Sequence, residues 1–99
     1  MSGQYMMKDG KPVLAHDVME WAKWYETANR SVEQDAVSGA NVSTVFLGLD
    51  HSFGSGPPVL WETRIFGGSH DDYQERYTTE EDARAGHRRA VELVRSSAQ

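Results

Sequence analysis

The segment VSTVFLGLDHSFGSGPPVLWETRIFGG, residues 42–68, decides the fold expected for this chain of 99 residues. Residues 42–49 and 59–66 are rich in β-branched and aromatic side chains, which favour strands. The nine residues between them, 50–58, contain two glycines and two prolines and make a connection longer than a tight hairpin turn. We therefore predict two strands, at 42–49 and 59–66, that pair across this long loop.

Three further elements are predicted before this segment. Asp9-Gly10 is a two-residue hairpin turn, because both positions tolerate a positive φ. Residues 16–29 carry apolar side chains at helical spacing, and Asp17 is a suitable N-cap. Residues 32–37 alternate as a short strand and lead into turn chemistry at 38–41.

A strand and a helix are predicted after the segment. Residues 73–78 alternate aromatic and polar side chains, as a half-buried strand does. Thr78 to Glu81 fits a capping box, and acidic residues precede basic ones in the helix that follows, which runs to about Ser96. The chain is therefore expected to form one α+β domain over residues 1–99. Its antiparallel sheet has three to five strands, with an N-terminal-half helix and a C-terminal helix packed on it.

Composition narrows the classes of function. A net charge of −5 argues against binding to DNA or RNA duplexes or to anionic membranes. No apolar run approaches the roughly 20 residues of a membrane span, and residues 1–11 lack the apolar core of a signal peptide. Cysteine is absent, which excludes disulfides and fits a reducing interior. We expect a cytoplasmic protein, and its small size favours a homodimer or a higher homo-oligomer.

The strand 59–66 has two faces of different character. Trp61, Thr63 and Ile65 share one face, on which Trp61 would be an ordinary core residue under the helices. The other face combines Arg64 and Phe66 with Leu60 and Glu62. Apolar side chains on a purely solvated face would be unusual, so this face is expected to be a protein interface, a ligand-binding wall, or both at once.

Arginines and glycines extend the list of candidate ligand-binding residues. Arg84 and Arg88 lie one turn apart on the C-terminal helix and match phosphate geometry, although ion pairs with Glu80 and Glu92 at i,i+4 spacing would also explain them. Gly67 and Gly68 either make a turn or let backbone amides approach phosphates. No P-loop or dinucleotide motif is present.

Catalytic and metal-binding chemistry is not expected. Asp50-His51 and His70-Asp71-Asp72 hold metal-ligand side chains, but no second histidine stands at ligand spacing. The serines lie in Gly/Ser-rich turns, and nothing identifies a nucleophile. Aromatic rings, scattered arginines and glycine turns together favour a non-enzymatic binder of a small nucleotide-like molecule, with neither cofactor nor metal.

Two stretches, VSTVFLGLDHSFGSGPPVLWETRIFGG and ERYTTEEDARAGH, resemble a group of small phage and prophage proteins. The shared pattern is STVFLGLDH, a Gly-Pro-Pro loop, an aromatic-Glu-Thr strand closed by Phe-Gly-Gly, and Arg-Tyr before a helix with Ala-Gly-His. It spans most of residues 42–87. Within this group the chain resembles the phage anti-Thoeris sponge proteins, which hold glycocyclic ADP-ribose between subunits without cleaving it; some relatives also bind cyclic oligonucleotides.

The resemblance implies roles for individual residues. Trp61 would stack on adenine, and Arg88, with Arg84, would meet the diphosphate from the C-terminal helix of a second subunit. The loop from Gly67-Gly68 to Asp72, with Asp71, would close over the ribose. The expected function is thus a phage anti-defence sponge acting in the infected bacterial host. A phage protein-binding inhibitor is the first alternative, and a small nucleotide hydrolase or lyase using Asp50-His51 or His70-Asp71 is the second.

Overall fold

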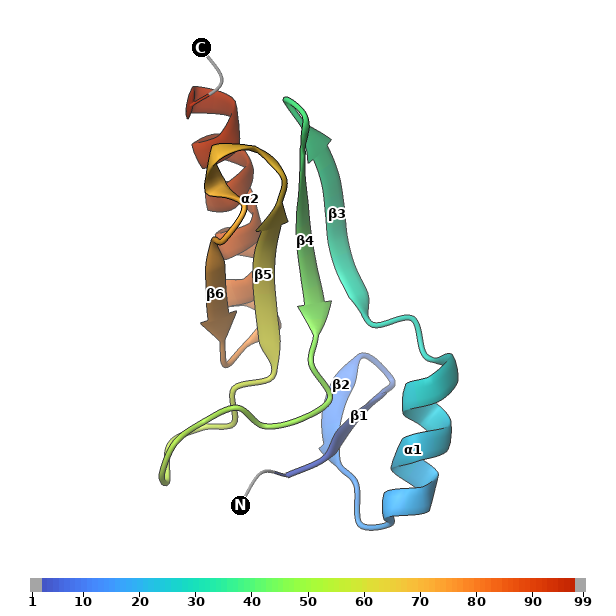
Figure 1. The fold of residues 1–99 in the computed structure, drawn as a ribbon. Coiled ribbons are helices and arrows are strands. Elements are labelled where there is room, and N and C mark those ends of the chain that lie inside the picture. The colour runs from blue at the N-terminus through green and yellow to red at the C-terminus, as the bar shows by residue number, and fades with distance from the viewer. Residues whose placement is uncertain (1–2, 98–99) are drawn as a thin grey trace.

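A computed structural model describes residues 3–97 of the chain, and Figure 1 shows its arrangement. Strands β1 (Tyr5–Lys8) and β2 (Lys11–Leu14) form an antiparallel hairpin. Asp9 and Gly10 join them with φ values of 51° and 78°, which confirms the predicted turn. Helix α1 (Val18–Thr27) follows, and the Asp17 carboxylate accepts hydrogen bonds from the first turn, as an N-cap does.

Four strands make the main sheet, in the order β3-β4-β5-β6 with every pair antiparallel. Their bounds are β3 Ser31–Val37, β4 Ala40–Phe46, β5 Trp61–Phe66 and β6 Gln74–Tyr77. The predicted pairing across the long loop is confirmed, with Phe46 opposite Trp61 and Asn41 opposite Phe66. The paired strands are shorter than expected, because residues 47–49 and 59–60 leave the ladder.

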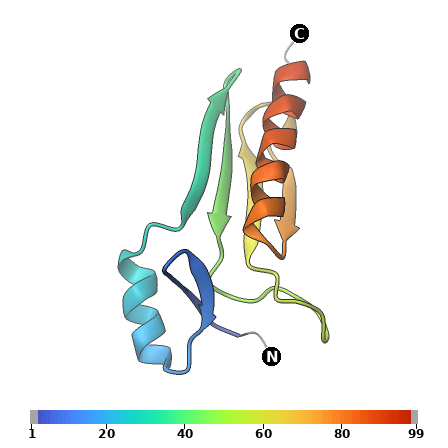
Figure 2. The same cartoon turned by 180° about the vertical axis from the view of Figure 1, so that it is seen from behind.

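Helix α2 (Glu80–Ser97) lies across one face of this sheet and contacts all four strands. Figure 2 shows α2 in front of the sheet, whereas the face seen in Figure 1 carries no helix. The α+β class is therefore confirmed. The capping hydroxyl belongs to Thr79, which accepts from the backbone N–H of Asp82 at 3.0 Å, so the helix begins one residue later than a Thr78–Glu81 box predicts.

Two apolar clusters fill the space between α2 and the sheet. One combines Ala40, Val42, Ile65, Ala90 and Val94 towards the C-terminal end of α2. The other combines Phe46, Leu60, Trp61, Tyr77 and Ala83 towards its N-terminal end. Three buried polar side chains belong to neither cluster and lie between α2 and the sheet, namely Thr44, Thr63 and His87. The centre of this interior is therefore polar, which makes it a candidate for a functional site.

Helix α1 packs on the N-terminal hairpin beyond one end of the sheet (Figure 1). The Trp21 indole N–H donates to the carbonyls of Tyr5 and Gly48, both at 3.1 Å, and the Trp24 ring meets Phe46 of β4 edge-on. No residue of α1 is buried, and Val18 and Met19 are 59% and 67% exposed. The apolar side of α1 is thus largely uncovered in a single copy.

The loop 50–58 is organised by one carboxylate. Asp50 accepts backbone hydrogen bonds from Ser52 at 2.8 Å and from Val59 at 2.9 Å. These bonds, that from Ser52 first, hold the pKa of Asp50 below its ordinary value. The loop 50–58 is thereby closed by its own first residue, so Asp50 has a structural role.

Candidate functional site

Trp61 does not lie where a stacking residue must lie. Its side chain is 3% exposed and packs edge-on against Phe46, with ring centroids 5.5 Å apart. Alternation along β5 turns it to the face that α2 covers, beside Tyr77 and Ala83. The expectation that Trp61 stacks on adenine is corrected accordingly, because a ligand ring has no access to this indole.

Arg64 and Phe66 lie on the opposite, open face of the sheet. The Arg64 guanidinium stands 5.3 Å from the centroid of the Phe66 ring, which is 47% exposed. On the same face Glu62 accepts hydrogen bonds from Gln74 at 2.8 Å and Arg76 at 2.9 Å. This face carries a half-exposed aromatic ring and paired charges, and α2 with its arginines is on the other side of the sheet.

Gly67, Gly68 and Asp71 form a turn at the end of β5. Gly67 has a φ of 90°, and its N–H donates to the Asp71 carboxylate at 2.5 Å. A Cβ on Gly67 would stand 3.2 Å from the carbonyl oxygen of Gly39, so close backbone approach also favours glycine here. The adjoining pocket is only about 150 Å³. A turn therefore explains the presence of these three residues without any bound ligand.

The expected arginines of α2 face the β3 edge of the sheet. Arg84 pairs with Glu80 at 3.0 Å, as its i,i+4 spacing predicted, and also with Glu33 at 3.5 Å. Glu92 pairs with Arg95 at 3.3 Å instead of with Arg88. Within residues 3–97, Arg88 forms no ion pair. The residues expected to share one site therefore occupy four separate places: the core, the open face, a turn and the β3–α2 side.

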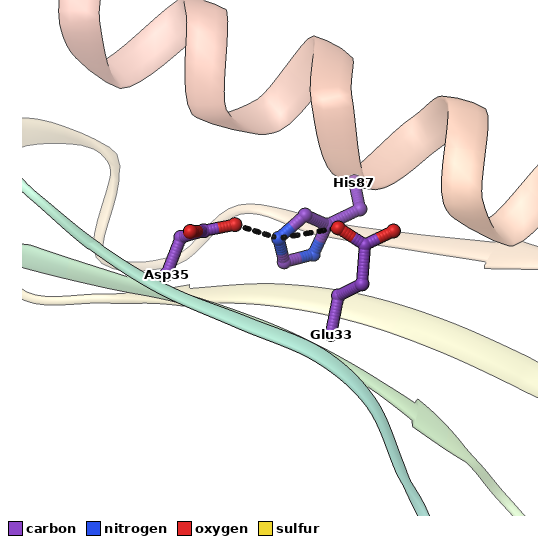
Figure 3. Close-up of side chains that lie close together, drawn as sticks. All are labelled: Glu33, Asp35 and His87. Atoms are coloured by element: carbon purple, nitrogen blue, oxygen red, sulfur yellow. Dashed lines mark hydrogen bonds and ion pairs between the residues drawn. The ribbon is translucent and has the colours of Figure 1, made fainter.

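The structure brings together three side chains that the sequence analysis did not single out as a group. His87 projects from α2 between Glu33 and Asp35 of β3 (Figure 3). Its Nε2 atom lies 2.7 Å from Asp35 Oδ2 and 3.8 Å from Glu33 Oε2. The imidazole is 1% exposed, whereas the Asp35 side chain is 50% exposed. A fully buried ring thus presents one nitrogen to two accessible carboxylates.

These residues line a groove of about 310 Å³ between β3 and α2. Its other walls are Arg88, Val91, Glu92 and Arg95. Within residues 3–97, Glu33, Asp35 and His87 are the one group of three metal-ligating side chains whose ligand atoms lie within 4.8 Å of one another. The groove therefore combines carboxylates, guanidiniums and a histidine nitrogen, which makes it the candidate functional site.

A buried hydrogen-bonded chain lies behind His87. The hydroxyls of Thr63 and Thr44 share a hydrogen bond, and Thr44 Oγ1 lies 2.7 Å from His87 Nδ1. Beside Thr63, the Tyr77 hydroxyl donates to Glu75, and burial raises the pKa of Tyr77 to about 12. Nδ1 is therefore held by a buried hydroxyl, and Nε2 is the nitrogen that faces the carboxylates.

The order Asp35–His87–Thr44 has the composition of an acid–base–nucleophile triad. Thr44 is nevertheless 0% exposed and lies beneath α2, so no substrate atom can reach its hydroxyl. In a working triad the nucleophile is the accessible member, whereas here the accessible member is the Asp35 carboxylate. The arrangement therefore does not support hydroxyl-based covalent catalysis.

A sequence signal for His87 does exist. Ala83, His87, Ala90 and Val94 are spaced by four, three and four residues, which places His87 on the buried stripe of the helix. Glu33 and Asp35 are two apart in a strand and hence on one face. These sequence patterns do not predict that α2 docks over β3, because this docking depends on long-range packing.

Replacing Thr44 by valine tests the buried chain. The change keeps the shape of the side chain but leaves His87 Nδ1 and the Thr63 hydroxyl without their shared partner. Leaving such buried groups unpaired costs about 1–3 kcal/mol, and we expect the free energy of unfolding to fall by that amount in urea denaturation. Ser43→Ala, next in the strand but on the open face, is the control; an equal effect of both changes would contradict a special role for the chain.

No protein-family model, no curated protein and no solved structure matches this chain. Within residues 3–97, no helix is both long enough and apolar enough to cross a membrane.

Proposed function

We propose that the protein binds and sequesters a small nucleotide-derived signal of the glycocyclic ADP-ribose type, without cleaving it, as a phage anti-defence sponge does. The binding site proposed is the groove between β3 and α2. The observation that carries the proposal is Arg88, an exposed guanidinium without an ion-pair partner among the described residues, which lines this groove together with Arg95.

Guanidinium groups suit a diphosphate because their planar fork matches pairs of phosphate oxygens. Each hydrogen bond to a charged group contributes about 1.5–3 kcal/mol, whereas nanomolar binding requires about 12 kcal/mol. Two bidentate arginines would contribute about 6–12 kcal/mol in all, and Arg95 is already paired with Glu92, so tight binding needs further contacts. The Thr44 hydroxyl is aligned with a histidine and a carboxylate, and its buried position supports binding over turnover.

A second copy of the chain is proposed as the source of those contacts. The groove volume of about 310 Å³ is near the lower end of small-molecule sites, so a dinucleotide-sized ligand would protrude from it. Apolar side chains on β2 and α1 remain exposed in one copy, namely Val13, Leu14, Val18 and Met19. Covering them against a second copy would stabilise the short helix α1, which buries no residue by itself.

The test is calorimetry of the purified protein with glycocyclic ADP-ribose, with the mass in solution measured in parallel. We expect binding with no change in the ligand recovered after heat denaturation. Arg88→Ala should weaken the affinity more than tenfold, and a dimeric or larger mass should be observed.

Arg64→Ala is the matched control for this test, because it removes the same charge from the open face of the sheet. It should leave the affinity unchanged. Loss of binding in Arg64→Ala but not in Arg88→Ala would move the site to the open face, and absence of binding or a degraded ligand would overturn the proposal. Capture of a stoichiometric host protein, without any small-molecule heat effect, would favour the protein-binding inhibitor instead.

A further inference from the structure

The groove has an electrostatic conflict that the proposed function leaves unresolved. Its walls carry two guanidiniums, from Arg88 and Arg95, against three carboxylates, from Glu33, Asp35 and Glu92. Arg95 is moreover paired with Glu92 at 3.3 Å. An anionic ligand entering this groove would meet Asp35, which is half exposed and has no guanidinium partner among the described residues. Something must neutralise the carboxylates before a phosphate is stable there.

The two ring nitrogens of His87 have different surroundings. Nδ1 lies 2.7 Å from the Thr44 hydroxyl beneath α2, whereas Nε2 lies 2.7 Å from Asp35 Oδ2 and 3.8 Å from Glu33 Oε2 on the groove side. When the ring proton is on Nδ1 and is donated to Thr44, the lone pair of Nε2 points towards the two carboxylates. In that tautomer a cation is the partner that Nε2 and the carboxylates can share.

We propose that Glu33, Asp35 and His87 bind one divalent transition-metal ion of the Zn²⁺ or Mn²⁺ class, with His87 Nε2 as its nitrogen ligand. The donor set, one imidazole nitrogen with two carboxylates, is of the borderline kind that such ions accept, whereas Mg²⁺ prefers oxygen alone. Thr44 acts behind the site by receiving the Nδ1 proton, which is the usual way in which the second nitrogen of a ligating histidine is held.

The geometry allows coordination with small side-chain movements. The donor atoms lie within 4.8 Å of one another, and metal–ligand bonds of about 2.0–2.2 Å require somewhat closer approach. Asp35 and Glu33 have the freedom to provide it, since they are 50% and 30% exposed, whereas His87 is fixed by burial. Arg84 contacts Oε1 of Glu33 at 3.5 Å, so Oε2 remains directed towards His87.

A bound dication would also help to hold the phosphates of the proposed ligand. This second part of the inference rests on the proposed function. Three protein ligands leave coordination positions open. On the groove side these positions face the space lined by Arg88, so a phosphate oxygen can complete the metal shell while the guanidinium holds its neighbours. The ion would thereby change the charge of the groove from net negative to net positive when His87 is neutral.

The first experiment uses the metal alone and so does not depend on any nucleotide. Zn²⁺, Mn²⁺ and Mg²⁺ are titrated into the metal-free protein by calorimetry, and ¹H–¹⁵N spectra of the histidine rings are recorded. We expect one equivalent of Zn²⁺ or Mn²⁺ to bind more tightly than Mg²⁺. With Zn²⁺ the His87 Nε2 resonance should shift while Nδ1 retains its proton. Glu33→Gln and Asp35→Asn should each weaken binding at least about tenfold.

Glu81→Gln is the matched control, an exposed carboxylate in the first turn of α2 that lies outside the groove. It should leave the metal affinity unchanged. Absence of binding would overturn the proposal and leave His87 with its hydrogen bond to Asp35. Binding that Glu33→Gln and Asp35→Asn do not weaken, or that leaves the His87 nitrogens unshifted, would overturn it as well, by placing the ion elsewhere.

The second experiment titrates inorganic pyrophosphate with and without one equivalent of Mn²⁺, under conditions in which free Mn²⁺–pyrophosphate is accounted for. We expect pyrophosphate to bind at least tenfold more tightly to the metal-loaded protein than to the metal-free one, and Arg88→Ala to abolish the gain. Equal affinity for pyrophosphate with and without the metal would overturn the proposed role of the ion in phosphate binding, while leaving the proposed sponge function intact. Metal binding without any pyrophosphate or nucleotide binding would reject the sponge and leave the metal site standing.

Discussion

Trp61→Ala is expected to lower the free energy of unfolding by about 3–5 kcal/mol, the range observed when a buried aromatic ring is truncated. The side chain is 3% exposed and contacts Phe46, Tyr77 and Ala83 in one cluster, so its removal leaves a cavity at the N-terminal end of α2. For a domain of this size that loss corresponds to a fall in Tm of more than about 10 °C, measurable by calorimetry.

Trp61→Phe separates ring packing from the indole nitrogen. Within residues 3–97 the Trp61 Nε1 atom has no hydrogen-bond partner, so phenylalanine removes volume but no hydrogen bond. We expect this variant to lose well under half of the stability that alanine loses. A folded, fully stable Trp61→Ala protein that has lost only ligand affinity would contradict the buried position and restore the stacking role.

Gly86→Ala is expected to destabilise the protein although alanine favours helices by about 1 kcal/mol over glycine. A Cβ at position 86 would overlap the hydroxyl and ring carbons of Tyr77, closer than any ordinary contact. Tyr77 is buried and hydrogen-bonded to Glu75, so its ring cannot swing away freely. Overpacking of this kind costs about 1–3 kcal/mol, and the close overlap places the net loss towards the upper part of that range.

Chemical denaturation of two further variants checks this explanation. Tyr77→Val opens space for the new methyl group, so Gly86→Ala should be much less harmful in the Tyr77→Val background than in the natural chain. Glu92→Ala, at an exposed position of the same helix, measures the effect of alanine without a steric conflict. If Gly86→Ala stabilises the natural chain, α2 does not approach β6 as closely as the structure places it.

Local sequence patterns determined the elements and their pairing. The strand pair across residues 50–58, the hairpin at Asp9-Gly10 and the Asp17 cap follow from side-chain preferences and turn chemistry within a few residues. The boundaries were less well predicted. Leu47 to Leu49 continue the apolar strand pattern, yet they fall outside β4, because the backbone turns at Gly48, with a φ of 77°, and Leu49 forms a bridge with Gln4.

The tertiary structure alone decided where the candidate site lies. Alternation along β5 divided Trp61 from Arg64 and Phe66, but only the docking of α2 determined which face became interior. His87 is separated from Glu33 and Asp35 by about half of the chain, and their meeting depends on β3 occupying the sheet edge beneath α2. The physical reason is that periodicity records which residues share a face, whereas the choice of the opposing face follows from packing summed over the whole molecule.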